Sequence, residues 1–416
     1  MSARILFLSQ LVPYPIDAGP KVRSYHVLQY LAAAGHRVTL VAFQRATDRP
    51  ENLEHLRQFC EEVHTVPMRR SRSRDAWHLA RSLLTGHPFM VIRDWSSAMA
   101  GLIRELLVTA PKSSQGRFDA IHADQLWMAP YALWASFQSI DRLRLILDQH
   151  NAVFQIPQRL AVLRRNPLIR TLLRWEARKL VRYEAMACSH FDCVVTVTPE
   201  DRDTLATLTM KRQRANRPSF VTIPICIDPA AKLPVSRVTC PRRVTFLGGL
   251  HWPPNAEGIL WFAREVWPQV VRQIPDAVLT VIGKEPPVQL VRQAASDSSY
   301  KITHYVSDPA PYLAETAVFI VPLHAGGGMR VKIVDAWSWG LPVVSTSIGA
   351  EGLNYRNGEN LLIADTSEAF AQAVVRLLTD PGLATRLGAV GRHTVEEYYD
   401  WHKVYRAWDS VYTGEP

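Results

Sequence analysis

Short runs of apolar residues, many of them β-branched, recur along the whole chain and alternate with longer stretches of helical character. In the first half of the chain these runs occupy residues 4–9, 37–43, 118–122, 144–148, 191–198 and 220–224. In the second half they occupy residues 244–250, 277–283, 302–306, 318–323, 341–346 and 360–364. Nearly continuous apolar runs of this length are typical of strands buried in parallel sheets. The alternation predicts repeated βαβ units, and therefore an α/β protein.

The two sets of runs are separated by residues 229–243, which show neither pattern and are interpreted as a linker. A chain of 416 residues is long enough for two domains with full hydrophobic cores. We therefore expect an N-terminal domain at residues 1–228 and a C-terminal domain at residues 244–399.

The most specific pattern lies at residues 318–345, with the sequence VFIVPLHAGGGMRVKIVDAWSWGLPVVS. A buried strand is followed by a loop that contains Gly326, Gly327 and Gly328, and three consecutive glycines let the backbone approach a ligand closely. A helix is expected over residues 329–339, ended by a glycine and a proline. The free N–H groups and the dipole of a helix N-terminus both attract anions, so this loop predicts an anion site.

Two cations follow the glycines directly. Arg330 and Lys332 are expected in the first turn of the helix, where the helix dipole disfavours positive charge. An anionic ligand would compensate both side chains, and a diphosphate would serve in this role. Asp335 lies three residues after Lys332 on the same helix face, where it can pair with Lys332 or bind a ligand hydroxyl.

The first βαβ unit contains a Pro-rich loop at residues 10–21, with Gly19 near its end. The unit lacks the Gly-x-Gly-x-x-Gly pattern, and Gln44 rather than an acidic residue follows its second strand. Both features argue against a dinucleotide, and we expect no cofactor. Polar residues also follow the strand at residues 144–148, among them His150. Strand ends in an open parallel sheet face the ligand crevice, although a single histidine is more often structural.

Positive charge is concentrated in the first half of the chain. The formal net charge is +10 overall, with +12 in residues 1–235 and −2 in residues 236–416. Residues 68–95 mix six arginines with tryptophan and leucine, which suits either an amphipathic surface helix or contact with an anionic bilayer. A second basic tract spans residues 159–182. This excess indicates an anionic surface or acceptor, such as a membrane, a lipid diphosphate or a nucleic acid.

The composition is that of a globular protein, with 47% hydrophobic and 21% charged residues. No run approaches the length of a transmembrane helix, and the N-terminus leads directly into a strand without the pattern of a signal peptide. The five cysteines are an odd number without the spacing of a metal site, so a reduced cytoplasmic protein is the simplest interpretation. They are Cys60, Cys188, Cys193, Cys226 and Cys240.

The stretch at residues 318–352 resembles the donor site of glycosyltransferase family 4, a family with the GT-B fold. One branch of that family carries Gly-Ser-Gly-Thr-Arg-x-Lys-x-x-Glu-Ala, then Gly-x-Pro-Val-Val-x-Thr, then Gly-Ala-Glu-Gly. The matching residues here are Gly326, Gly328, Arg330, Lys332, Ala336, Gly340, Pro342, Val343, Val344, Thr346, Gly349, Ala350, Glu351 and Gly352. The resemblance implies two Rossmann-like domains facing an interdomain cleft. The nucleotide sugar would bind the second domain and the acceptor the first, and residues 400–416 would cross back to the first domain.

The resemblance also implies roles for individual residues. As catalytic residues, Arg330 and Lys332 would stabilise the negative charge of the leaving diphosphate together with loop N–H groups, with no metal required. The third catalytic residue would be His150, which would face the transferred sugar and lies in an Asp-x-His-Asn pattern at residues 148–151. The implied donor-binding residues are Gly19, Gly248, Gly249, Gly326, Gly327, Gly328, Asp335 and Glu351.

Three positions depart from the family pattern. Asp335 stands where the family normally has glutamate. Gly249 occupies the position of an arginine that binds the diphosphate in many relatives, and the cations after the glycine-rich loop would supply the missing charge. Ile225 and Cys226 replace the Asn-Gly pair that usually precedes the linker.

The sequence therefore predicts a retaining glycosyltransferase that moves a sugar from a nucleotide-sugar donor to a glycan or lipid-linked acceptor, in the synthesis of cell-surface polysaccharide or glycolipid. We expect no nucleic acid partner, and a cytoplasmic protein that can bind peripherally to the inner face of the membrane. Two alternatives stay open at this point. One is a catalytically inactive GT-B partner protein, which the three departures favour slightly and the intact Arg330 and Lys332 oppose, and the other is a GT-B nucleotide-sugar epimerase.

Overall fold

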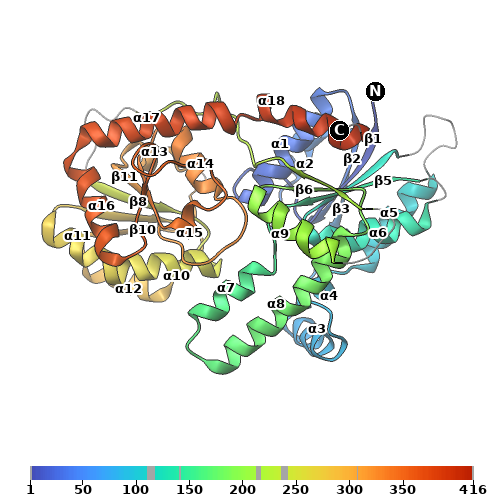
Figure 1. Ribbon diagram of the computed structural model, residues 1–416, viewed down its shortest axis with the longest axis horizontal. Helices are drawn as coiled ribbons and strands as arrows, with labels where there is room; N and C mark the ends of the chain where they lie inside the picture. The colour runs from blue at the N-terminus through green and yellow to red at the C-terminus, as the bar shows by residue number, and fades with distance from the viewer. Residues whose placement is uncertain are drawn as a thin grey trace. The chain divides into compact units, whose positions relative to one another are not determined.

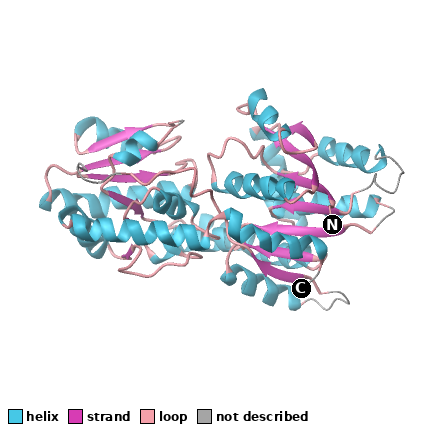
Figure 2. Cartoon of the chain, turned by 90° about the horizontal axis from the view of Figure 1, so that it is seen from above, coloured by secondary structure: helices cyan, strands magenta, loops and turns pink. Residues whose placement is uncertain are grey.

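The computed structural model describes residues 2–109, 118–139, 142–211, 217–235, 242–306 and 308–414. The chain forms two compact units: unit 1 consists of Met1–Cys226 with Trp401–Pro416, and unit 2 consists of Ile227–Asp400. Each unit is a parallel sheet covered by helices (Figures 1 and 2). The expected α/β class with parallel sheets is therefore confirmed.

The sheet of unit 1 has seven strands in the order β3-β2-β1-β4-β5-β6-β7. The strands are β1 Arg4–Ser9, β2 Arg37–Gln44, β3 Glu62–Pro67, β4 Ala120–Asp124, β5 Arg144–Gln149, β6 Cys193–Thr196 and β7 Ser219–Thr222. Along β1, Leu6 and Leu8 pack into one core, while Ile5 and Phe7 pack into a second core on the other face. Because both faces are buried, the central strands read as continuous apolar runs.

Nine α-helices belong to unit 1 in the described residues before Cys226. They are α1 Gly19–Ala33, α2 Pro50–Arg57, α3 Arg72–Thr85, α4 Phe89–Arg93, α5 Ser97–Thr109, α6 Ala129–Gln138, α7 Gln155–Leu163, α8 Pro167–Cys188 and α9 Pro199–Met210. The last two helices of the chain, α18 Trp401–Val404 and α19 Trp408–Thr413, also belong to unit 1. Trp408, Val411 and Tyr412 are buried in the same core as Ile5 and Phe7, so the end of the chain closes one face of the sheet.

The sheet of unit 2 has six strands in the order β10-β9-β8-β11-β12-β13. They are β8 Arg243–Leu247, β9 Val278–Ile282, β10 Tyr300–Thr303, β11 Val318–Val321, β12 Val343–Ser345 and β13 Leu362–Ile363. The helices are α10 Pro253–Trp261, α11 Trp267–Gln273, α12 Val288–Ser296, α13 Ala310–Ala314, α14 Val331–Ser338, α15 Ser347–Ala350, α16 Ser367–Thr379 and α17 Pro381–Tyr398. The core between them is built around Phe246, Phe262, Trp267 and Phe370.

Strand β3 is an element that the apolar pattern did not predict. Its sequence, EVHTVP, is half polar, and only Val66 is buried. It pairs with β2 alone and forms the edge of the sheet, so one side of it is free of strand neighbours. Edge strands need less apolar character than central ones, which explains why this signal is weak.

The strand order reverses once in each sheet, between β1 and β4 in unit 1 and between β8 and β11 in unit 2. In open parallel sheets, ligands bind beside the carboxyl ends of the strands at such a point. The loops after these four strands are therefore the places where a site is expected.

None of the helices in the described residues combines the length and the apolar character that a membrane span requires. Cys60, Cys188, Cys193 and Cys226 are buried and form no disulfide with one another, and Cys240 lies outside the described residues.

Candidate active site

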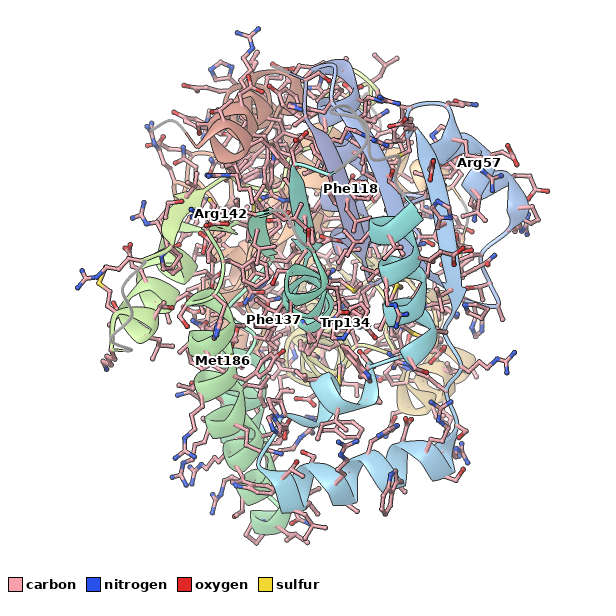
Figure 3. All side chains as sticks on the ribbon, turned by 90° about the vertical axis from the view of Figure 1, so that its right-hand side faces the viewer. Arg57, Phe118, Trp134, Phe137, Arg142 and Met186 are labelled. Carbon is pink, nitrogen blue, oxygen red and sulfur yellow. The ribbon has the colours of Figure 1, made fainter. Side chains whose placement is uncertain are left out.

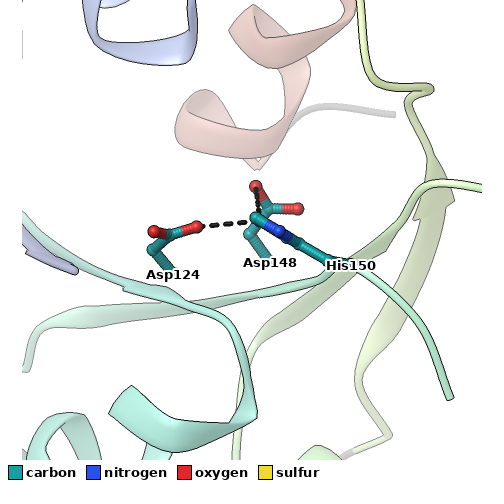
Figure 4. Close-up of side chains that lie close together, drawn as sticks. All are labelled: Asp124, Asp148 and His150. Atoms are coloured by element: carbon teal, nitrogen blue, oxygen red, sulfur yellow. Dashed lines mark ion pairs between the residues drawn. The ribbon is translucent and has the colours of Figure 1, made fainter. Parts of the chain in front are cut away.

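Buried charged side chains meet at the carboxyl ends of β4 and β5 in unit 1 (Figure 4). The strand register places Asp124 directly beside Asp148. His150 follows β5, and its Nε2 lies 2.8 Å from Oδ1 of Asp124 and 3.7 Å from Oδ2 of Asp148. The exposed fractions are 1% for Asp124, 0% for Asp148 and 8% for His150, so the charges of these three groups are screened little by water.

Arg23 of α1 completes this cluster. Its Nε and Nη2 donate to the two carboxylate oxygens of Asp148, each at 2.9 Å. Its Nη1 donates to the backbone carbonyls of Ile223 and Pro224 at 2.8 and 2.7 Å. Burial opposes the charge of Asp148, but Arg23, ahead of the nearby histidines, keeps the pKa of that carboxyl well below its usual range. The pair is thus a fully bonded, bidentate ion pair.

His150 has the opposite balance. Burial disfavours its charged form, but Asp124, followed by Asp148, outweighs burial and raises the pKa of the imidazole to about 9. The ring is therefore mainly an imidazolium at neutral pH.

Glu184 of α8 holds the loop that follows β5. It accepts hydrogen bonds from the backbone N–H groups of Val153 and Phe154 at 2.8 and 2.9 Å, and from Nε2 of Gln149 at 3.0 Å. Burial raises the pKa of Glu184 to about 8. These bonds bracket His150 on both sides, so the position of its backbone is well determined.

The ligand atoms of Asp124, Asp148 and His150 lie within 4.8 Å of one another, a spacing that could suit a metal ion. However, both oxygens of Asp148 already accept from Arg23, whose positive charge also repels a cation. We therefore interpret the cluster as a network of ion pairs.

In unit 2 the glycine-rich loop joins β11 to α14. Gly326 and Gly328 have φ angles of 146° and 68°, which side chains other than glycine rarely adopt. A Cβ atom at Gly326 would lie 2.7 Å from Nη2 of Arg330. Nη1 of Arg330 donates to the carbonyls of Gly327 and Gly328 at 2.5 and 2.7 Å. The sequence predicted Arg330 in the first turn of the helix. In the structure α14 begins at Val331, so Arg330 directly precedes the helix.

Lys332 reaches from α14 to the end of β8. Its Nζ donates to Oδ1 of Asn255 at 2.8 Å and lies 4.6 Å from the centre of the Phe246 ring. A Cβ atom at Gly248 would approach this Nζ to 2.7 Å, so a glycine there leaves room for the ammonium group. Burial, followed by repulsion from Arg330, lowers the pKa of Lys332 to about 7.

Two contacts frame this pair of cations. Nδ2 of Asn255 donates to the carbonyl of Gly249 at 2.8 Å, which ties α10 to the end of β8. Oε2 of Glu351, the residue after α15, lies 3.7 Å from Nη2 of Arg330. The arrangement places two cations beside glycine-lined backbone, which suits an anionic ligand with several oxygens.

Asp335 forms an ion pair with Lys232, and this partner differs from the Lys332 considered in the sequence analysis. The segment that carries Lys232 is tied to unit 2, because Nη1 of Arg392 donates to the Lys232 carbonyl at 2.9 Å. The backbone N–H of Val235 also donates to a carbonyl of unit 2 at 3.0 Å. Burial lowers the pKa of Lys232 to about 8.

Two family models match the chain. One, described as glycosyl transferase 4-like domain, matches residues 18–217, and the other, described as glycosyl transferases group 1, matches residues 241–380. This chain is a group 1 glycosyltransferase. The resemblance to family 4 that the glycine-rich block carries is thereby confirmed.

Relatives of the glycosyltransferase differ in how much of it they match. A Klebsiella pneumoniae protein described as an uncharacterized 44.6 kDa protein in the cps region is 22% identical over an alignment of 419 residues. The match covers 97% of this chain and 98% of the relative. A GDP-mannose-dependent alpha-(1-6)-phosphatidylinositol monomannoside mannosyltransferase of Mycolicibacterium smegmatis is 28% identical over 149 residues. That match covers 32% of the glycosyltransferase and 39% of the relative.

Solved structures resemble the glycosyltransferase over its full length. Sucrose-phosphate synthase from Thermosynechococcus elongatus has a TM-score of 0.68 at 17% identity, covering 99% of this chain and 98% of that one. Anabaena Alr3699/HepE in complex with UDP and glucose has a TM-score of 0.67 at 14% identity, covering 99% of each chain. At this level of identity the likeness shows the fold alone, which is GT-B, as expected.

The structure gathers most of the residues that the sequence singled out into two groups. In unit 2, those at the ends of β8 and β11 are Gly248, Gly249, Gly326, Gly327, Gly328, Arg330, Lys332 and Glu351. In unit 1, His150 belongs to the buried cluster, whereas Gly19, the first residue of α1, is not one of the residues that the ion pairs of that cluster join. Asp335 lies three residues beyond Lys332 on α14 and is paired with Lys232.

Several residues of these groups were missed by sequence reasoning. Asp124 had a usable signal, since it is an acidic residue at the end of an apolar run. Arg23, Asn255 and Lys232 had none, because each lies in a helix or loop whose local pattern says nothing about its distant partner.

Proposed function

We propose that this glycosyltransferase transfers a sugar from a nucleotide-sugar donor, with retention of configuration, to a glycan or lipid-linked acceptor in the synthesis of cell-surface polysaccharide or glycolipid. The observation that carries the proposal is the placement of Lys332 beside Gly248 and of Arg330 against the glycine-rich loop, at the strands where the order of the unit 2 sheet reverses. The names of the relative in a cps region, the mannosyltransferase and the HepE complex with UDP and glucose support it.

The chemistry follows from these charges. Breaking the bond between sugar and diphosphate leaves negative charge on phosphate oxygens, and preorganised donors stabilise that charge most effectively. Arg330 and Lys332 provide such donors, and the loop backbone adds N–H groups. Asp335 is proposed to bind a hydroxyl of the ribose or sugar, and Glu351 to contribute through Arg330 and the loop. With no carboxylate assigned as nucleophile, the acceptor would attack on the face that the diphosphate leaves.

Substitution of the two cations tests the donor site. Arg330→Ala and Lys332→Ala should each slow transfer while the protein stays folded. Each change should remove roughly 2–4 kcal/mol of transition-state stabilisation. Arg386→Ala is the control, because Arg386 is an exposed arginine of the same unit. Transfer is measured with the nucleotide sugar that gives the largest thermal shift in a panel of nucleotide sugars and nucleoside diphosphates. Wild-type turnover in both cation variants would reject the assignment.

The same panel separates the alternatives. Donor binding followed by slow hydrolysis or transfer supports a transferase. Binding without turnover would point to an inactive partner protein, and a changed sugar on an intact nucleotide would point to an epimerase.

For the acceptor side, we propose that unit 1 binds an anionic membrane surface through α3 and the turn between α7 and α8 (Figures 1 and 3). Among its fully described residues, α3 buries only Ser82. The exposed apolar side chains are Trp77, Leu79, Leu83 and Leu84 on α3, and Val162, Leu163, Leu168, Ile169 and Leu172 around the turn. The exposed arginines of the same segments are Arg72, Arg74, Arg81, Arg165, Arg170 and Arg174. Exposed apolar groups mixed with arginines suit an anionic bilayer.

Helix α8, which follows the turn, is bonded to α3 and to the start of α4 within unit 1. Nζ of Lys179 in α8 donates to Oγ of Ser82 in α3 at 2.6 Å, and Oε1 of Glu176 accepts from the backbone N–H of Phe89 at 2.7 Å. A lipid-linked acceptor would therefore meet a surface of defined shape.

Vesicle sedimentation tests this part of the proposal. The protein should pellet with anionic vesicles at low salt, be released at high salt, and ignore neutral vesicles, because exposed charges are screened by salt. Replacing Arg69, Arg72 and Arg74 with glutamine should weaken pelleting without abolishing transfer to a water-soluble acceptor analogue. Arg70 is left in place because it pairs with the buried Asp94. A matched triple change of the exposed unit 2 arginines Arg292, Arg376 and Arg386 should have less effect. Equal pelleting with both vesicle types would reject the surface.

A further inference from the structure

The charge balance of the buried cluster in unit 1 depends on His150. Arg23 and Asp148 neutralise each other through two hydrogen bonds. Asp124 is then left with the imidazole of His150, at 2.8 Å, as its cationic neighbour. A neutral imidazole would leave a buried carboxylate without a counter-charge, which is strongly unfavourable.

Asp124 is itself held by two hydroxyl groups. Its Oδ2 lies 2.8 Å from the hydroxyl of Ser9 and 2.7 Å from the hydroxyl of Ser24. Each hydroxyl is also within reach of a backbone carbonyl, but an ionised carboxylate is the stronger acceptor. Since β1 supplies Ser9 and α1 supplies Ser24, two elements of unit 1 fix the position of the Asp124 side chain.

We propose that Asp124 is a positioning residue that keeps His150 as an imidazolium, so that the ring meets the transferred sugar only as a hydrogen-bond donor. The inference rests on the proposed function and on the family resemblance, which implies that His150 faces the transferred sugar. An imidazolium carries a proton on both nitrogens and cannot accept a hydrogen bond. The ligand atom it binds must therefore be an oxygen acceptor, which we assign as a hydroxyl oxygen of the sugar.

The surroundings of the ring agree with this assignment. Nδ1 of His150 is buried and has no hydrogen-bond partner among the described residues, so its proton is not committed within unit 1. The side chain is 7% exposed. Asp124 and Asp148 raise the pKa of this ring against the effect of burial, to about 9.

One other histidine faces the cluster. The charged and titratable groups near His150 are Arg23 from α1, His122 and Asp124 from β4, and Asp148 from β5. Nδ1 of His122 is bonded to the Tyr412 hydroxyl at 2.6 Å, and its Nε2 lies 3.7 Å from a carboxylate that Arg23 already neutralises. His150 is thus the better placed of the two to balance Asp124.

Nuclear magnetic resonance of the full chain with ¹⁵N-labelled histidine tests the charge state without substrate or turnover. His150 is assigned by comparison with His150→Gln. Its two ring nitrogens should show imidazolium shifts at pH 7.5, and in Asp124→Asn the titration should move down by about one pH unit or more. Asp124→Glu should restore part of the shift, and His122→Gln should leave it unchanged. A neutral His150 in the native chain, or a shift in His122→Gln equal to that in Asp124→Asn, would overturn the proposal.

The pH dependence of transfer tests the consequence. Because the pKa of Lys332 is lowered to about 7, the profile is measured in a Lys332→Arg background, where kcat/KM should fall as pH rises through about 9, and should fall at lower pH with Asp124→Asn. That variant should also bind the nucleotide sugar more weakly, by about tenfold for one charged hydrogen bond, with the affinity for the nucleoside diphosphate unchanged. If both affinities fell equally, the contact would be to phosphate and the assignment of a sugar hydroxyl would be wrong. Should Asp124→Asn fail to fold, Ser24→Ala, which removes one hydroxyl donor, should give a smaller shift in the same direction.

Discussion

Lys332 lies where its own charge is disfavoured. Burial and the neighbouring Arg330 lower the pKa of its ammonium group to about 7, so at pH 8 most molecules carry a neutral amine. A diphosphate beside Nζ would favour the charged form. Donor binding is therefore coupled to protonation of this one side chain.

Proton uptake on donor binding is the resulting prediction. At pH 8 the protein should take up roughly one proton per nucleotide sugar bound, and donor affinity should fall as pH rises from 7 to 9. Lys332→Arg should bind without proton uptake, because a guanidinium stays charged throughout this range. Calorimetry in two buffers with different ionisation enthalpies measures the uptake. Identical heats in the two buffers would show that Lys332 keeps its charge state on binding.

Asp335 has two possible partners at the residue scale, a ligand hydroxyl and Lys232. Asp335→Asn should weaken donor affinity by about tenfold, and Asp335→Glu should be tolerated because the family resemblance implies a glutamate at this position. Lys232→Met removes only the ion pair. If Asp335 serves only to hold Lys232, then Asp335→Asn and Lys232→Met should lower the melting temperature equally and leave the dissociation constant of the donor unchanged.

At the scale of elements, α14 and α17 pack so closely that glycines form the contact. A Cβ atom at Gly391 would lie 2.3 Å from Cδ1 of Trp337, and one at Gly388 would lie 2.1 Å from the carbonyl of Gly340. Trp337 cannot swing away freely, because its Nε1 donates to the carbonyl of Asn360 at 2.8 Å. The helix that carries Lys332 is thus held from behind by a rigid surface.

We expect Gly391→Ala to destabilise unit 2 by about 1–3 kcal/mol, as overpacking does in a close-packed core. Gly101→Ala in α5 is the matched control, since nothing lies within 4 Å of its added Cβ. It should stabilise the protein by about 0.5–1 kcal/mol, because alanine loses less backbone entropy than glycine in a helix. Denaturant unfolding followed by tryptophan fluorescence measures both. Equal stability of the two variants would mean that α14 and α17 can move apart enough to accommodate the added methyl group.

At the scale of the whole molecule, the last helices belong to the first unit. The Trp408 ring lies 4.9 Å from the Arg23 guanidinium, and the Tyr412 hydroxyl is bonded to His122. The end of the chain therefore covers the buried cluster that holds His150.

Trp408→Ala should lower the stability of unit 1 by about 3–5 kcal/mol, since it empties a large, fully buried site. Trp77→Ala, at a tryptophan that is 67% exposed, should change stability by less than about 0.5 kcal/mol. Thermal unfolding compares them. A small effect at Trp408 would indicate that unit 1 folds without its C-terminal helices.

The periodic pattern was sufficient for the α/β class and for most strands, because burial on both faces leaves a local, nearly continuous apolar signature. It failed at β3, where an edge position relaxes that requirement. The glycine-rich loop could also be predicted from the sequence, because residues other than glycine rarely adopt the φ angles found at Gly326 and Gly328. These features are determined within a few neighbouring residues.

The charge pairs were decided by tertiary structure alone. Arg23 and Asp148 are 125 residues apart, Lys332 and Asn255 are 77 apart, and Lys232 and Asp335 are 103 apart. Which cation meets which carboxylate depends on strand order and helix packing, and no local periodicity encodes either. The sequence by itself determined where a glycine-rich loop would form and which family it resembles. The protonation states of His150 and Lys332 depend on burial and on partners that are distant in the sequence. Each state therefore arises only when the unit that carries the residue has folded.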